Sequence, residues 1–151
     1  MIDTRQSPRA APLHDLAQAL RRAGLQVTAQ RLAVYRAVRA SPHAVADDIS
    51  ARVRTDIGAI SRQAVYDALR TMAERGLVRR IQPAGSAARY EAQAHDNHHH
   101  LVCRRCDAVV DVACATGAAP CLATDHDHGY AIDEAEVIYW GVCPDCQRAG
   151  D

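Results

Sequence analysis

Two pairs of cysteines have the residue type and the spacing to do chemistry. In each pair two residues separate the cysteines, which are Cys103 with Cys106 and Cys143 with Cys146. A Cys-x-x-Cys turn directs two thiolates to one point, and two such turns complete a tetrahedron of sulfur ligands around Zn²⁺. Four protein ligands leave no position open for water or a substrate, so the spacing predicts a structural zinc site and not a catalytic one.

The separation of the two pairs is longer than in a compact zinc ribbon. The 36 residues between them, 107–142, exceed the roughly 15–20 of a ribbon, so a small sheet must lie between the pairs. The alternative is a thioredoxin-like redox pair, which needs a Cys-x-x-Cys that opens a helix after a strand. The presence of two pairs, with Pro144 just inside the second, favours zinc.

Three consecutive histidines, His98, His99 and His100, stand directly before the first cysteine pair. On an extended chain successive side chains point to opposite sides, so His98 and His100 share one side. With Glu91 upstream and Asp111 on the next strand they supply two nitrogen and two oxygen ligands. This set suits Fe²⁺, Mn²⁺ or Zn²⁺ and leaves room for a further ligand. The alternative is a solvated polar turn. A run of three histidines is uncommon, and this disfavours the alternative.

Two further groups have no single assignment. Cys114 and Cys121 are seven positions apart, and they are either small hydrophobic residues or an oxidation-sensitive or metal-binding pair. His126 and His128 form either another metal site or part of an ordinary polar loop.

The elements that position these groups begin with a helical first half. Apolar residues recur at helical spacing from Leu13, and Gly24 is placed to end the first helix. Thr28 and Ser61 are suited to cap the second and fourth helices, since a hydroxyl there accepts a hydrogen bond from the first turn. The predicted helices span about 13–23, 29–40, 45–57 and 62–75, and strands follow at 77–81 and 88–92 around the turn 83–86.

A capped fourth helix followed by a hairpin gives the element order of a winged helix. In such a unit the last helix enters the major groove of DNA, and the hairpin lies as a wing beside the backbone. Arginine can read guanine, glutamine can read adenine, and tyrosine can touch a thymine methyl group or a phosphate. The alternative interpretation of any single arginine is that it only keeps a basic surface soluble in water. The candidate DNA-contacting residues are Ser61, Arg62, Gln63, Tyr66 and Arg70 on the helix and Arg79, Arg80 and Arg89 on the wing.

Charge is sorted between the two parts of the chain. Residues 1–89 hold 15 Arg against 7 acidic residues, a net charge of +8, and residues 90–151 hold 3 Arg against 11, a net charge of −8. The formal net charge of the whole is therefore zero. This split predicts a basic half that meets a polyanion and an acidic half that binds a cation.

The second part of the chain, from about Ala94, has the pattern of strands. The candidate strands are 101–102, 109–112 and 136–142, with a short helix or loop at 113–122. Apolar residues occupy both alternating sets of the last strand, so we expect both of its faces to be buried. About 55 residues make a small independent domain, so a metal, a partner subunit or both must add stability.

Composition disfavours several classes of protein. No apolar run approaches the roughly 18 residues of a membrane span, and residues 1–12 lack the apolar core of a secretory signal. We therefore expect a cytoplasmic protein with no membrane partner, in which cysteines bind metal or do redox chemistry. A zinc hydrolase or deaminase needs an open metal position beside a general acid–base, and its motifs are missing, so we expect no enzyme and no small-molecule substrate. A metal-storage protein would leave the winged helix unused.

Four motifs together resemble the ferric uptake regulator (Fur) family of metal-dependent bacterial repressors. The resemblance runs from about Leu13 to Cys146, and it is similar in detail to the actinobacterial FurA/CatR branch, whose members typically repress neighbouring catalase-peroxidase genes. The motifs are Ala23-Gly-Leu-Gln-Val-Thr-Ala-Gln-Arg31, Ser61-Arg-Gln-Ala-Val-Tyr66, Asn97-His-His-His-Leu-Val-Cys-Arg-Arg-Cys106 and Cys143-Pro-Asp-Cys146.

The resemblance implies an α+β homodimer that binds double-stranded operator DNA. Its parts are a flexible tail (1–12), a winged-helix DNA-binding domain (13–92) and a small C-terminal α/β dimerisation domain (93–148). The four paired cysteines hold structural zinc, and Arg31 joins the DNA-contacting residues. The regulatory metal (Fe²⁺, Mn²⁺ or Zn²⁺) falls on five residues, His43, Glu91, His98, His100 and Asp111.

The chain departs from the family pattern at several positions. At the family's further metal site Asn97, Ala118 and Ala135 replace common ligands and only His99 remains, so we expect no working site there. Gln26 replaces a frequent minor-groove lysine. The family's peroxide sensors usually have Asp where this chain has Glu91, whereas the branch resemblance and the extra thiols favour redox control. The resulting interpretation is a redox-responsive repressor of catalase-peroxidase and oxidative-stress genes and of its own gene. The alternative is a repressor of metal-uptake genes that responds to iron or zinc supply.

Overall fold

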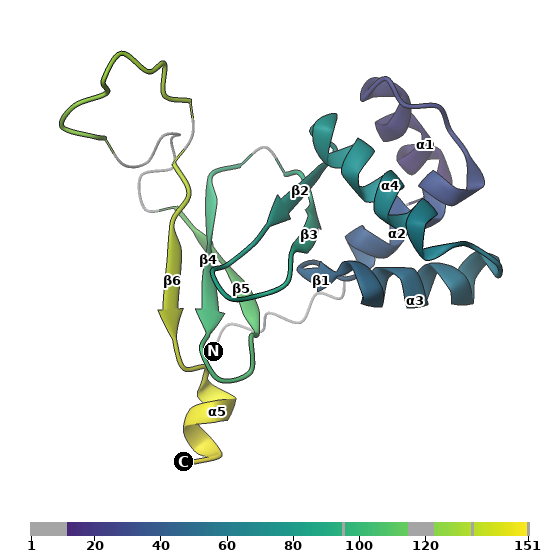
Figure 1. Ribbon diagram of the computed structural model, residues 1–151. Helices are drawn as coiled ribbons and strands as arrows, with labels where there is room; N and C mark the ends of the chain where they lie inside the picture. The colour runs from purple at the N-terminus through teal and green to yellow at the C-terminus, as the bar shows by residue number, and fades with distance from the viewer. Residues whose placement is uncertain (1–11, 95, 115–122, 134, 151) are drawn as a thin grey trace. The chain divides into compact units, whose positions relative to one another are not determined.

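The computed structural model describes residues 12–94, 96–114, 123–133 and 135–150. The chain divides into two compact units, Met1–Gln93 and Ala94–Asp151. Figure 1 labels their helices and strands. In the described part of the chain no helix combines the length and the apolar composition that crossing a membrane requires.

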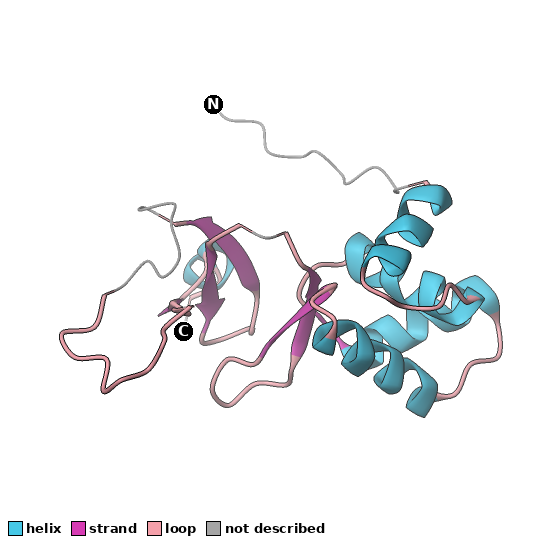
Figure 2. Cartoon of the chain, turned by 90° about the horizontal axis from the view of Figure 1, so that it is seen from above, coloured by secondary structure: helices cyan, strands magenta, loops and turns pink. Residues whose placement is uncertain are grey.

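The first unit consists of helices and a small antiparallel sheet with strand order β1-β3-β2. Thr28 Oγ1 accepts a hydrogen bond from the Arg31 backbone N–H at 3.2 Å, and Ser61 Oγ accepts one from Ala64 at 3.1 Å. Both predicted caps are therefore confirmed. The four predicted helices are confirmed as well, and Figure 2 draws the helices in cyan. The elements are α1 (Leu13–Arg22), α2 (Ala29–Ala40), β1 (Ala44–Val45), α3 (Ala46–Ile57), α4 (Arg62–Glu74), β2 (Val78–Ile81) and β3 (Arg89–Ala92).

The core of this unit lies between the helices, where α2 packs against α1, α3 and α4. The apolar face of each helix supplies fully buried side chains at a spacing of three or four residues. Because α4 turns this face inward, its polar face points to solvent. The apolar helical residues with 0% exposure are Leu16, Leu20, Val34, Val38, Ile49, Val53, Val65, Leu69 and Met72.

The second unit is a three-stranded sheet with strand order β5-β4-β6 and a short helix. Strand β4 (His98–Cys103) runs antiparallel to β5 (Val109–Ala113) and parallel to β6 (Ile138–Gly141), and α5 (Pro144–Arg148) follows. Parallel neighbours end at the same edge of a sheet. The ends of β4 and β6 therefore lie side by side, just where the two cysteine pairs occur (Figure 1).

Three sequence-based expectations for this unit differ from the structure. Strand β4 begins at His98 and not at Leu101, so all three histidines are strand residues. The expectation that both faces of the last strand are buried is wrong for the single chain, because β6 is an edge strand and Tyr139 is half-exposed. Helix α5 was not anticipated, since five residues are too few for a helical pattern. The expected helix or loop at 113–122 lies almost wholly outside the described residues.

Candidate metal centres and nucleic-acid interface

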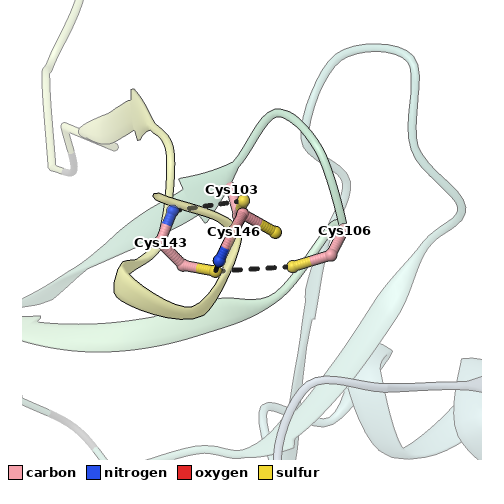
Figure 3. A group of neighbouring side chains, drawn as sticks. All are labelled: Cys103, Cys106, Cys143 and Cys146. Atoms are coloured by element: carbon pink, nitrogen blue, oxygen red, sulfur yellow. Dashed lines mark hydrogen bonds between the residues drawn. The ribbon is translucent and has the colours of Figure 1, made fainter. Parts of the chain in front are cut away.

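The two cysteine pairs meet where the parallel strands end. Cys103 is the last residue of β4 and pairs with Gly141, the last residue of β6, so Cys143 follows only two residues further on. The Arg104 backbone N–H donates to the Gly141 carbonyl at 2.8 Å and extends the pairing into the first Cys-x-x-Cys turn. All four cysteine Sγ atoms lie within 4.8 Å of one another. Figure 3 shows these side chains converging from two separate turns.

The geometry of this thiol cluster fits a zinc ion. A tetrahedral site with Zn–S bonds of about 2.3 Å has sulfur atoms about 3.8 Å apart. The Sγ atoms of Cys106 and Cys143 are 3.7 Å apart (Figure 3). The arrangement therefore suits a closed site with four thiolate ligands.

Hydrogen bonds in the cluster shift the pKa values of its thiols in different directions. Backbone N–H groups, that of Cys143 first and those of Cys106 and Arg105 after it, lower the pKa of Cys103 to about 6. The pKa of Cys146 is raised to about 12, chiefly by its hydrogen bond with the Cys143 side chain. Thiolates this close repel one another, so all four ionise together only when a cation balances their charge.

Local structure fixes the second cysteine turn against the first. Cys143 caps α5, because its Sγ accepts the Cys146 backbone N–H at 3.5 Å, and Pro144 occupies the first helical turn. The Arg105 guanidinium donates to the carbonyls of Gly150 at 2.9 Å and Cys146 at 3.3 Å. Sequence reasoning missed Arg105, because its partners are more than forty residues away.

The first unit supplies one half of the expected regulatory site. His43 Nε2 lies 2.9 Å from Glu91 Oε2, and both side chains are nearly buried. The His43 backbone has φ 64°, a left-handed conformation that costs a non-glycine residue about 1–2 kcal/mol. Its backbone N–H donates to the Tyr90 carbonyl at 2.9 Å, which holds this conformation beside β3. Arg79 Nη1 lies 3.9 Å from Glu91 Oε1.

The second unit supplies the other half. Asp111 on β5 pairs across the sheet with His100 on β4, and its Oδ1 lies 3.5 Å from His100 Nε2 and 3.8 Å from His98 Nε2. The two rings face each other edge-on at 5.1 Å, as expected for alternate residues of one strand. Asp96 Oδ1 lies 2.6 Å from His98 Nδ1. Such a carboxylate fixes the tautomer that directs Nε2 toward a metal. Asp96 was not foreseen, although a carboxylate two residues before a ligand histidine is a readable signal.

The remaining histidines and cysteines of the second unit have other contacts. The His99 ring packs edge-on against Tyr139 at 6.5 Å, and His126 and His128 are exposed neighbours with ring centroids 4.4 Å apart. Cys114 Sγ accepts a hydrogen bond from Asn97 Nδ2 at 3.3 Å. Cys121 lies outside the described residues, so the structure does not choose between the alternatives given for Cys114 and Cys121.

The candidate DNA-contacting residues fall into groups by position. A groove of about 620 Å³ runs along the polar face of α4 to β2 and β3, and Gln63, Tyr66, Arg70 and Arg80 line it. Arg62 is exposed in the first turn of α4. Arg31 lines a second groove of about 310 Å³ and donates to the Gln26 carbonyl. Arg79 lies near Glu91, and Arg89 donates to the His43 carbonyl at 3.0 Å, so these two wing residues support the metal-ligand pair.

A winged-helix unit joined to a small sheet with thiolate and imidazole ligands defines a metal-binding regulator of transcription. The chain matches the model of the Ferric uptake regulator family over residues 22–140 and belongs to this family. Regulators of this family bind DNA operators and act as dimers. The protein is thus a metal-responsive transcriptional regulator, a class distinct from enzymes.

Named relatives and solved structures agree with this assignment. The chain is 55% identical over 132 residues to transcriptional regulator FurA of Mycobacterium tuberculosis, covering 87% of this chain and 90% of that protein. It is 29% identical over 136 residues to the peroxide-responsive repressor PerR of Staphylococcus aureus, with 89% and 91% covered. The fold is similar to that of the Helicobacter pylori ferric uptake regulator, with a TM-score of 0.69, 18% identity, and 95% and 99% covered.

Proposed function

We propose that this protein is a metal-dependent, redox-responsive repressor of catalase-peroxidase and oxidative-stress genes and of its own gene. It acts as a homodimer on double-stranded operator DNA in the cytoplasm. The observation that carries the proposal is an incomplete set of candidate metal ligands in each unit, of which only Asp111 is half-exposed: His43 with Glu91, and His98 with His100 and Asp111. The similarity to FurA and to a peroxide-responsive repressor supports the choice of signal.

The regulatory ion takes ligands from both sets. Fe²⁺ and Mn²⁺ prefer four to six nitrogen and oxygen ligands, and neither set alone provides that number. Glu91 is only 4% exposed and lies between His43 and Arg79, so its carboxylate is held at a defined place beside the imidazole ring. The thiol cluster is the separate structural zinc site.

Metal and DNA binding are coupled through the arrangement of the two units. An ion shared between them favours one arrangement over others and shifts the population toward it. If this arrangement spaces the two α4 helices of the dimer for successive major grooves, metal raises operator affinity. The usual coupling of about 1–3 kcal/mol changes that affinity by about 5–150-fold.

An apolar row on the second unit supports the homodimer. Leu101, Val110 and Tyr139 are neighbours across β4, β5 and β6, and they are 45%, 57% and 48% exposed in the single chain. Adjacent exposed apolar side chains on a sheet face typically mark an interface. A second copy of the chain covers this row in the proposed dimer.

The test uses a duplex that the Mn²⁺-loaded protein selects from a randomised DNA pool. We expect His98→Ala to lose the metal-dependent gain in affinity for this duplex, by about 5–150-fold in a gel-shift titration. His126→Ala, which removes an exposed histidine of the second unit, is the matched control and should retain the gain. Metal-dependent binding that survives His98→Ala contradicts the regulatory site.

The second candidate signal is metal supply, which Glu91 favours because the family's peroxide sensors usually have Asp there. Peroxide acts at bound Fe²⁺ or at a thiolate, and it converts a thiolate to a sulfenic acid with release of hydroxide. We expect peroxide to release the Fe²⁺-loaded protein from the selected duplex. Release by a chelator, with no effect of peroxide, would instead identify a sensor of metal supply.

A further inference from the structure

An acidic residue lies among the basic and aromatic side chains that are proposed to contact DNA. Asp47, in the first turn of α3, accepts hydrogen bonds from Arg62 Nε at 2.9 Å and Nη2 at 2.5 Å. The Tyr66 hydroxyl donates to the same carboxylate at 3.3 Å. The Arg62 guanidinium also lies over the Tyr66 ring, 6.0 Å from its centroid. Asp47 thus connects two exposed residues of α4 that are one helical turn apart.

A second carboxylate, Asp67, plays the same part further along α4. It accepts a hydrogen bond from Gln63 Nε2 at 3.1 Å and another from Arg70 Nη2 at 3.2 Å. The partners stand four residues before it and three residues after it, on the same face of the helix. Each of the four polar side chains on α4 that sequence analysis assigns to DNA therefore contacts a carboxylate.

Stability does not explain the Asp47 pair. The side chains of Arg62 and Asp47 are 63% and 56% exposed, and ion pairs at such exposure contribute little, because water already solvates both charges. A negative charge on a DNA-facing surface also repels phosphate. The carboxylates therefore weaken the electrostatic attraction to DNA of any sequence. Their contribution must instead be to sequence specificity.

The geometry of Arg62 shows what that contribution is. A guanidinium has five N–H donors, and Asp47 uses those on the Nε and Nη2 edge. The Nη1 group and the second N–H of Nη2 form the opposite edge, which can donate two hydrogen bonds to guanine O6 and N7. An arginine held in this way presents a fixed fork to a base and has less freedom to swing toward a phosphate.

Asp67 restricts the side chain of Gln63 in the same way. One N–H of its side-chain amide is given to Asp67, and the amide oxygen and the second N–H remain for adenine N6 and N7. The side chain loses its rotamer freedom before DNA binds. A matching base therefore gains more binding free energy than a mismatched base.

We propose that Asp47 and Asp67 are specificity-determining positioning residues for DNA recognition. They hold the reading edges of Arg62 and Gln63 toward bases, and their charge disfavours binding to phosphates of any sequence. The proposal rests on the proposed function, in that it takes α4 as the helix that contacts the operator. It concerns the ratio of specific to non-specific affinity and not affinity alone.

The experiment compares Asp47→Asn with Asp48→Asn in the full-length, metal-loaded protein. Both substitutions remove one negative charge from the first turn of α3, but within the described residues Asp48 has no hydrogen-bond or ion-pair partner. Fluorescence anisotropy gives the Kd for the selected duplex and for a scrambled duplex of equal length over a range of salt concentrations. We expect Asp47→Asn to reduce the ratio of the two affinities roughly tenfold, the scale of one bidentate base contact, and Asp48→Asn to leave the ratio unchanged.

A repeated selection gives a second readout. Asp47→Asn protein should select DNA with a weakened guanine preference at one position of each half-site, and Asp67→Asn should weaken an adenine preference. An equal loss of ratio in Asp47→Asn and Asp48→Asn would reduce the effect to net charge and overturn the proposal. An unchanged ratio in Asp47→Asn would overturn it as well.

Arg62→Ala separates this proposal from the assignment of the interface. If Arg62→Ala leaves the affinity for the selected duplex intact, the assumed interface is wrong and both ideas fail. If Arg62→Ala weakens binding while Asp47→Asn keeps the ratio, only the role of the carboxylate fails.

Discussion

The helical unit and the sheet unit differ in the means available to stabilise each. The core of the first contains 18 buried apolar residues from every helix and from the sheet. In the described part of the second (96–114, 123–133 and 135–150), the buried residues are Val102, Cys103, His99 and His100. Burial of apolar area is the main source of folding stability, so the first unit has its own source, and we expect the second to depend on bonds to metal and on a partner.

This difference suits a metal-responsive regulator. The helical core contains none of the proposed metal ligands, so we expect α4 to keep its shape in the presence and absence of metal. The second unit places its proposed ligands on strands, so we expect metal binding there to contribute folding free energy as well. Variants that remove the zinc, a core side chain, the apolar row or a helix cap, one at a time, test this difference between the two units.

Loss of zinc should have the largest effect, and it should be confined to the second unit. In Cys146→Ser or after chelation, we expect β4–β6 to lose amide protection while α1–α4 keep theirs. Structural zinc in zinc-finger peptides contributes roughly 10–16 kcal/mol, as much as the whole stability of a typical domain. Hydrogen–deuterium exchange with zinc analysis provides the measurement.

Cys114→Ser serves as the control for this experiment, because Cys114 is not one of the clustered cysteines. It should keep a full zinc content. Stable, zinc-bound dimers of both Cys103→Ser and Cys146→Ser would disprove the thiolate site.

A cavity in the helical core should have the next largest effect, in the other unit. Leu69→Ala removes a fully buried side chain of α4 and should lower the free energy of unfolding by about 2–5 kcal/mol. Zinc content should stay unchanged, because the thiol cluster belongs to the other unit. Urea unfolding followed by circular dichroism gives the value, and Leu13→Ala, at an exposed position on α1, is the control. Loss of zinc in Leu69→Ala would mean that the helical core and the zinc site do not stabilise their units independently.

Charge on the apolar row should weaken self-association. Leu101→Glu places a carboxylate on the exposed row of the sheet, and we expect the dimer to lose about 2 kcal/mol, roughly thirtyfold in Kd. Analytical ultracentrifugation measures this change. Tyr130→Glu, at a more exposed position outside the strands, should leave the dimer intact. A dimer unaffected by Leu101→Glu would place the interface elsewhere.

Removal of a helix cap should have the smallest effect. Ser61→Ala deletes the hydroxyl that accepts the Ala64 N–H and should cost about 1 kcal/mol in the first unit alone. Ser61→Asp keeps an acceptor and should restore the stability. The thermal midpoint of the helical transition is the readout, and no recovery with Ser61→Asp would show that Ser61 does not act as a cap.

The first unit was predictable because its signals are local. Hydroxyl caps at Thr28 and Ser61 and helical apolar spacing act within a few residues, so all four helices and the hairpin were predicted. Strand β1 was missed because two residues carry no periodicity. In the second unit the start of β4 and the half-exposed face of β6 depend on partners distant in sequence, whereas the five residues of α5 are too few to show a helical pattern.

The site residues divide in the same way. The cysteine spacing predicted that the four thiols meet, and the histidine run predicted that His98 and His100 share one side of the strand. The contacts of Asp96, Arg105 and Asp47 were not foreseen. The last two join residues at least 15 positions apart, and no repeating pattern in a single sequence reports such a pair.

The sequence alone determined the ligand chemistry, the separation of charge into a basic and an acidic part, and the local helices and turns. These properties depend on residue type and on neighbours within about one or two turns. Only the tertiary structure decided that β4 and β6 run parallel and end together at the thiols, and that a left-handed His43 faces Glu91. It also decided that carboxylates hold the side chains of α4. The physical reason is that strand pairing and long-range contacts are selected by the packing of the whole unit, which compensates local costs such as the His43 backbone.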